Sequence, residues 1–89
     1  MSTEAETRAE WLDSKFWDRL DRLEGQHRRL QCEHESARRN MHESVRRHTN
    51  DTDPAAAREI REAWRRYCSV IAQLDRATSE LESLRQSAP

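Results

Sequence analysis

The chain has 89 residues, of which 34% are hydrophobic and 37% charged, and its formal net charge is −1. A chain this short and this polar holds one small domain and cannot build a large globular core. A net charge close to zero removes any bulk electrostatic attraction to nucleic acid. One glycine and two prolines leave little for the turns of a β-sheet, so the composition is typical of long solvated helices.

The first predicted helix covers about residues 4–49 and carries two interleaved rows of residues at seven-residue spacing. One row consists of Phe16, Leu23, Leu30, Ala37 and Ser44, and the other of Leu20, His27, His34, Met41 and His48. This is the heptad pattern of a coiled coil, with histidine at positions where leucine is usual. Gly25 costs ~1 kcal/mol in a helix interior. The heptads continue across it, so we expect one unbroken helix.

Residues 50–53 are predicted to form a turn, and the second helix to cover about residues 54–86. Asp53 is a favoured N-cap residue, and Pro54 fits the first helical position, where a missing N–H costs nothing. We expect its seam to consist of Ala57, Ile60, Trp64, Tyr67, Ile71, Leu74, Thr78 and Leu81. A further apolar row lies beside this seam: Ala63, Val70, Ala77 and Leu84.

Two helices joined by a short connection pack as antiparallel neighbours. The predicted fold is therefore all-α: one domain over residues 1–89, built as a long, coiled-coil-like antiparallel helical hairpin. The expected register sets Trp64 opposite Ala37 and Tyr67 opposite His34. The further apolar row of the second helix then stays uncovered, and pairing with a second copy into a four-helix bundle would cover it.

An aromatic cluster near the N-terminus adds to the apolar surface, because exposed tryptophans are frequent interface anchors. The first functional hypothesis is therefore a non-enzymatic protein–protein interaction module, with an adaptor, inhibitor or chaperone-like role, that binds a protein target, a second copy of itself or both. The predicted partner or oligomer interface consists of Trp11, Leu12, Phe16, Trp17, Ala63, Trp64, Val70, Ala77 and Leu84.

The histidine row, formed by His27, His34 and His48, supports three interpretations. The histidines can be polar seam residues that fix register and oligomeric state. They can form a pH switch: burial would lower their pKa, so that the seam loosens below about pH 6. They can also bind a metal ion across a dimer, with Cys68 adding a thiolate. A metal- or pH-responsive bundle is thus the second hypothesis, although no Cys-x-x-Cys motif or i, i+4 histidine pair supports a metal.

Arg28, Arg39 and Arg46 align on one outer stripe of the first helix and support a third hypothesis, a nucleic-acid-associated regulator. Glutamates three or four residues away are the usual intrahelical partners on a solvated face, so we expect no nucleic-acid binding. No catalytic spacing or glycine-rich turn is present, so we predict no enzymatic activity and no cofactor or metal.

The chain shows no signal peptide and no apolar run long enough for a membrane span, so the cytoplasm is the expected location. Cys32 and Cys68 do not face each other in the expected register, and we predict free thiols. The overall layout resembles that of small secreted or chaperone-like helical hairpins, although the Trp-x-Gly turn of one such group is replaced here by Asn50-Asp51-Thr52-Asp53.

Overall fold

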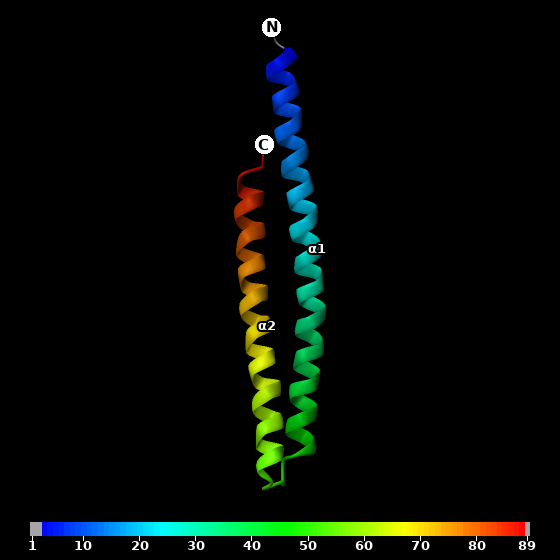
Figure 1. The fold of residues 1–89 in the computed structure, drawn as a ribbon, viewed down its shortest axis with the longest axis vertical. Coiled ribbons are helices and arrows are strands. Elements are labelled where there is room, and N and C mark those ends of the chain that lie inside the picture. Colours follow the sequence, from blue (N-terminus) through cyan, green and yellow to red (C-terminus); the bar gives the residue numbers. More distant parts are fainter. Residues whose placement is uncertain (1–2, 89) are drawn as a thin grey trace.

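The computed structural model describes the backbone of residues 3–88 and the side chains of residue 8 and of residues 10–88. Two helices account for this part of the chain: α1 covers Thr3–Arg47 and α2 covers Pro54–Gln86. They lie side by side and run in opposite directions, joined by a short turn (Figure 1). The prediction of an all-α helical hairpin is confirmed.

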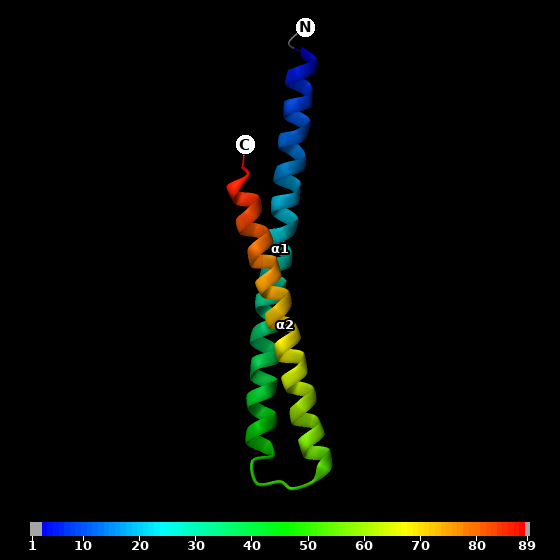
Figure 2. The ribbon, with the colours of Figure 1, turned by 90° about the vertical axis from the view of Figure 1, so that its left-hand side faces the viewer.

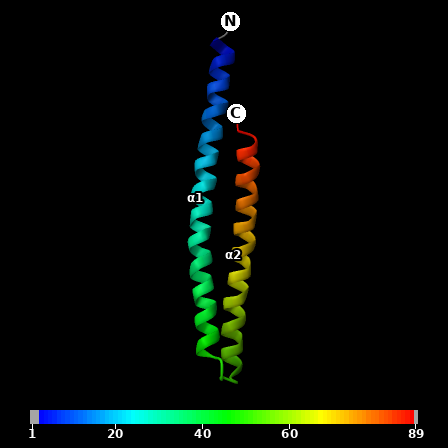
Figure 3. The ribbon, with the colours of Figure 1, turned by 180° about the vertical axis from the view of Figure 1, so that it is seen from behind.

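The hairpin is a thin rod, 76 × 16 × 15 Å. A side view shows that the two helices cross, so they coil about each other as the heptad pattern requires (Figure 2). With 45 residues against 33, α1 is longer than α2. At 1.5 Å per residue this difference leaves about 18 Å of α1 without a facing helix. The unpaired segment is the N-terminal end, which projects beyond the C-terminus in Figure 1 and in the view from behind (Figure 3).

Local sequence explains where the helices end. Arg46 and Arg47 occupy the last turn of α1, where positive charge is favourable against the helix dipole. Asp53 is the N-cap of α2, and its side chain accepts a hydrogen bond from the backbone N–H of Ala55 at 3.1 Å, with Pro54 at the start of the helix as predicted. Gly25 lies inside α1 without interrupting it, which confirms the unbroken helix.

The seam of α1 is the predicted one. Leu23, Leu30 and Ala37 are buried. The other members of both predicted rows are half-buried: Phe16, Leu20, His27, His34, Met41, Ser44 and His48.

The seam of α2 was half wrong. The predicted row of Ile60, Tyr67, Leu74 and Leu81 does face α1, since its members are half-buried or buried. The other half of the seam lies one residue earlier than predicted. Its members are Ala56, Ala63, Val70, Ala77 and Leu84, which are likewise buried or half-buried. Of the other predicted row, Trp64, expected against Ala37, is 54% exposed, and Ala57 is exposed as well. Its other two members, Ile71 and Thr78, are half-buried, and Thr78 contacts His27 of α1.

Side-chain size explains this shift. The row that faces α1 is made largely of alanines, and Ala37 on the opposite helix is 1% exposed. Small residues let two helix axes approach closely, whereas an indole at the same position would hold them apart or clash. The structure thus buries the small row and leaves Trp64 outside. Val70 is 6% exposed and Ala77 is 4% exposed, so both lie inside the hairpin. They were expected to belong to a free partner interface, and the hairpin itself covers them instead.

Candidate functional site

One side of the hairpin presents a row of aromatic side chains at its surface. The ring centroids of His34 and Tyr67 lie 5.4 Å apart across the two helices, and those of Tyr67 and Trp64 lie 6.0 Å apart along α2. The His34–Tyr67 contact confirms that layer of the predicted register. The rings are progressively less covered, from half-buried His34 and Tyr67 to Trp64, which is more than half exposed.

Trp17 and Val45 belong to the same side. Both sit at the heptad position of α1 that also holds Glu24, and both are exposed. Glu24 contacts Arg85, whose guanidinium lies 3.4 Å from its carboxylate, and Arg85 shares the heptad position of Trp64 on α2. The two stripes therefore flank one side of the hairpin. We call this side the Trp64 face, made up of Trp17, His34, Val45, Trp64, Tyr67 and Ile71.

The opposite side of the hairpin is polar. A shallow hollow of about 340 Å³ lies across both helices there. Its lining is largely charged or amide-bearing, with two small residues: Asn40, Glu43, Ser44, Arg47, Glu59, Glu62, Ala63 and Arg66. The two sides of the rod are thus chemically different: the Trp64 face exposes Trp17, Val45 and Trp64, with the Glu24–Arg85 ion pair among them.

The open end of the hairpin carries the remaining predicted interface residues. Trp11 and Leu12 are more than half exposed, and the ammonium of Lys15 lies 4.1 Å from the centroid of the Trp11 ring. Phe16 meets Trp17 edge to face, with centroids 5.2 Å apart. Leu12 and Phe16 line a hollow of about 520 Å³ together with Leu84, at the point where α2 ends. The aromatic N-terminal cluster is thus a real surface feature.

Each member of the histidine row contacts α2. Besides the His34–Tyr67 contact, His27 lies with its Nε2 atom 3.1 Å from the hydroxyl of Thr78, whose O–H donates in turn to the carbonyl of Leu74. His27 Nε2–H therefore donates to Thr78. The expected register, continued along the helices from Tyr67 opposite His34, puts His27 opposite Leu74, one turn away from Thr78. These contacts support the interpretation of the histidines as residues that fix the register.

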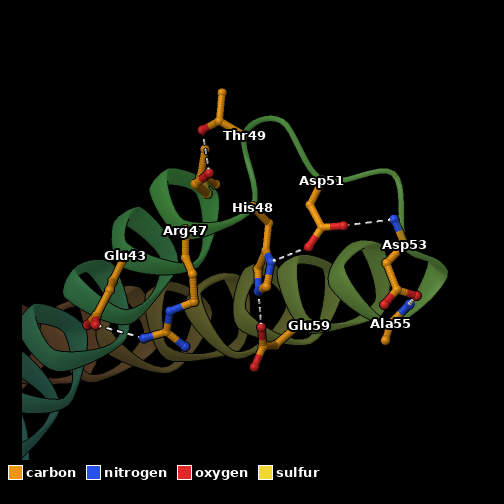
Figure 4. A network of polar contacts seen from close by, with 9 residues as sticks. Glu43, Arg47, His48, Thr49, Asp51, Asp53, Ala55 and Glu59 are labelled. Carbon is orange, nitrogen blue, oxygen red and sulfur yellow. Dashed lines mark hydrogen bonds and ion pairs between the residues drawn. The ribbon is translucent and has the colours of Figure 1, made fainter.

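Among the described side chains, His48 forms the most connected polar group (Figure 4). Its Nε2 atom contacts the carboxylate of Glu59 on α2, and its Nδ1 atom lies 3.3 Å from a carboxylate oxygen of Asp51. The other Asp51 oxygen accepts from the backbone N–H of Asp53 at 3.0 Å. We call this group, His48, Asp51, Asp53 and Glu59, the polar turn. It links the end of α1 to the start of α2.

A histidine with a carboxylate at each ring nitrogen can donate to both only when protonated. The hydrogen bond to Glu59 holds the pKa of His48 above its ordinary value of 6.5, partial desolvation opposes this, and Asp51 adds to it. The backbone N–H of Asp53, and after it His48, lowers the pKa of Asp51. The predicted acid-sensitive switch is therefore wrong for His48, because its charged form is the stabilised one.

The other candidate residues are surface residues. Cys32 and Cys68 are free and exposed, as predicted. Within the part of the chain that the structure describes, no group of three or more histidine, cysteine, aspartate or glutamate side chains is arranged to hold a metal ion. The metal site that Cys68 and the histidine row were predicted to form would lie across a dimer, so it stays a prediction.

The arginine stripe of Arg28, Arg39 and Arg46 is exposed. Arg39 pairs with Glu35 at 3.9 Å, which is the intrahelical partnership expected for a solvated face. Glu43 pairs with Arg47, at 2.8 Å, and not with the stripe. Pairs this exposed contribute little to stability.

Comparison with known proteins adds no assignment: no family model matches the chain, and no curated protein or solved structure matches it. No helix within the described residues combines the length and the apolar character needed to cross a membrane.

Proposed function

We propose that this chain is a non-enzymatic protein-interaction module that self-associates through the Trp64 face. The observation that carries the proposal is a set of exposed large apolar side chains on one side of the hairpin, spaced along the rod on both sides of the Glu24–Arg85 ion pair. Trp17, Val45 and Trp64 are between 46% and 54% exposed there, whereas the opposite side is lined by charged residues. Large apolar patches on one side of a small protein are typical of protein–protein contacts.

The total exposed area supports the same conclusion. The chain exposes 7339 Å². A compact monomer of this mass, 10.6 kDa, would expose about 5,500 Å². The excess of roughly 1,800 Å² is larger than the ~800 Å² that each partner buries in a standard interface. Covering the Trp64 face with a second hairpin would bury part of this excess in a four-helix bundle.

The internal core is small as well. Within the described side chains, the buried hydrophobic residues are seven, and three of them are alanines: Leu23, Leu30, Ala37, Ala56, Val70, Ala77 and Leu81. Burial stabilises at about 25 cal/mol per Å², and an alanine offers little area to bury. A partner on the Trp64 face would bury aromatic rings that the hairpin alone leaves in water. Adaptor, inhibitor and chaperone-like roles all use such a surface, and free thiols suit a reducing compartment such as the cytoplasm.

The experiment is a comparison of solution mass by light scattering after size exclusion, at several concentrations. We expect the wild type at twice the chain mass of 10.6 kDa. Trp64→Ala should weaken dimerisation by about 2 kcal/mol, roughly thirtyfold in Kd, because tryptophan is a frequent hot-spot residue. Arg65→Ala is the matched control on the neighbouring exposed position, and it should leave the mass unchanged. A wild type that stays at the monomer mass would overturn self-association.

A pH-responsive role has one observation in its favour, the polar turn. Its direction differs from the sequence-based expectation: contacts of charged His48 are present at mildly acidic pH and weaken as the pH rises through its raised pKa. This role would modulate the hairpin and is compatible with the interaction module.

A further inference from the structure

The hairpin has opposite charge at its two ends. Gly25 is the midpoint of α1. Counted along both helices from the contacts His34–Tyr67, His27–Thr78 and Glu24–Arg85, it lies level with residues 76, 80 and 84 of α2, so we divide α2 at the middle value, between residues 79 and 80. The turn half, residues 25–79, holds eleven arginines against eight acidic residues, a charge of +3 with histidines neutral. The open half, residues 1–24 and 80–89, holds five basic against nine acidic residues, a charge of −4. The net charge of −1 is thus the sum of a positive turn half and a negative open half.

This polarity distinguishes the two ways in which two hairpins can pair. In a parallel dimer the two turns lie together, so +3 faces +3 and −4 faces −4. In an antiparallel dimer each acidic open half lies along the basic turn half of the other copy. Complementary charge favours the second arrangement, and like-charge juxtaposition suppresses the first.

Helix length favours the same arrangement. Trp17 lies 30 residues before the end of α1, about 45 Å along the axis, and Trp64 lies 10 residues after the start of α2, about 15 Å along it. An antiparallel overlap of about 60 Å therefore brings Trp17 of each copy level with Trp64 of the other. That overlap nearly equals the ~67 Å length of α1. It also places the unpaired N-terminal segment of α1 beside the turn half of the partner.

We propose that the partner on the Trp64 face is a second copy of this chain in antiparallel orientation, with the acidic open half of one hairpin lying along the basic turn half of the other. The proposal rests on the self-association proposed above and specifies its geometry. A two-fold axis relates the copies, so both pairs of ends make the same contacts and the assembly closes at two.

Spin labels on the dimer test this orientation. In a Cys32→Ser/Cys68→Ser background, Asn50→Cys places a label on the exposed turn, and Gln26→Cys places one near the midpoint of α1. The antiparallel dimer predicts turn labels about 60 Å apart. Turn labels within about 20 Å, the width of a four-helix bundle, would overturn the proposed orientation.

The midpoint label separates a wrong orientation from a failure to self-associate. The two Gln26→Cys labels lie close together in the parallel and in the antiparallel dimer. If neither label position shows dipolar coupling, no dimer forms, and the proposed function is overturned as well. Salt gives an independent measurement. Kd should rise several-fold between about 50 and 500 mM salt for the antiparallel dimer, because screening removes the attraction between unlike halves. A Kd that falls with salt would contradict it.

Discussion

At the turn end of the hairpin, α1 and α2 are joined by a chain of polar contacts that runs from Glu59 through His48 and Asp51 to Asp53. At the open end, the described contacts are an exposed ion pair between Glu24 and Arg85 and a hollow beside Leu84. The lining of this hollow mixes apolar with charged side chains: Leu12, Phe16 and Leu84 with Lys15, Asp18, Arg19 and Arg22. One end is held by local hydrogen bonds that the chain supplies itself. The other exposes Trp11 and Trp17 and an unpaired length of helix. Local polar contacts therefore hold the turn end, whereas the open end leaves apolar side chains in water. The Trp64 face belongs to neither end alone, because Trp17 lies in the open half and Trp64 and Val45 lie in the turn half.

Both ends depend on the seam between them, and the largest expected effect follows from damaging it. Val70→Asp would bury an unpaired carboxylate opposite α1 and cost about 3 kcal/mol or more, enough to unfold a hairpin with so small a core. Ser69→Asp changes the neighbouring exposed residue and should be nearly neutral. Urea unfolding followed by circular dichroism measures both. Equal stability of the two variants would mean that Val70 is not in the seam.

The turn end is tested by removing the N-cap. Asp53→Ala deletes the side chain that accepts from Ala55 N–H, and should lower the free energy of unfolding by about 1 kcal/mol. Asp53→Ser keeps an acceptor oxygen and should recover most of the loss. Thr52→Ala, at the preceding turn residue, serves as the control. A cap variant as stable as this control would show that the turn end is not held as described.

Gly25 lies where the two halves meet. A Cβ atom added there would meet nothing within 4 Å, and the residue is helical. Gly25→Ala should therefore stabilise the hairpin by up to about 1 kcal/mol, since alanine has the higher helix propensity. Thermal unfolding measures the gain, with Gln26→Ala as the matched exposed position. A loss of stability would indicate that the glycine is needed for a bend or a close approach.

The smallest expected effect is the pH dependence of the polar turn, because Asp51 and Glu59 are 43% and 51% exposed and solvent screens their contacts. The pKa of His48 is raised in the folded state, so its contribution to the free energy of unfolding is complete below pH 6.5. This contribution is lost as the pH rises through the folded-state pKa of His48. Asp51 has a lowered pKa, so its contribution is present above pH 3.8 and is lost below it.

The wild type should accordingly show a Tm that falls between about pH 6 and 8.5 more than that of His48→Asn, which isolates His48 from the other histidines. If Tm changes with pH in the same way for the wild type and for His48→Asn, the polar turn does not contribute to the pH dependence of stability.

The fold class followed from the heptads, because a seven-residue repeat over several turns has few structural solutions. The seam of α2 did not follow from the heptads, because an apolar row lies on each side of the row that contains Tyr67. That row belongs to both the predicted and the observed seam. Hydrophobicity favoured the row with Trp64, whereas the structure buries the row with Ala63 and Val70. Side-chain volume was the signal that could have decided this: alanines opposite Ala37 permit close approach, and an indole does not.

The polar turn was missed for a different reason. The i, i+3 spacing of His48 and Asp51 is visible in the sequence, but Glu59 lies eleven residues away on the other helix. Its contact with His48 depends on the register of the hairpin. The sequence-based expectation treated His48 as a buried neutral ring, and the sign of its pKa shift reversed once two carboxylates were placed beside it.

The hairpin topology also orders the contacts by their distance along the chain. Sequence separation is 11 between His48 and Glu59, 51 between His27 and Thr78, and 61 between Glu24 and Arg85. The entropy of closing the loop rises by only about 1.5 kcal/mol over this series. We expect folding to start at the turn and to proceed contact by contact toward the open end, at the high rate typical of local topologies. The aromatic end is then the last part to form and the first to fray.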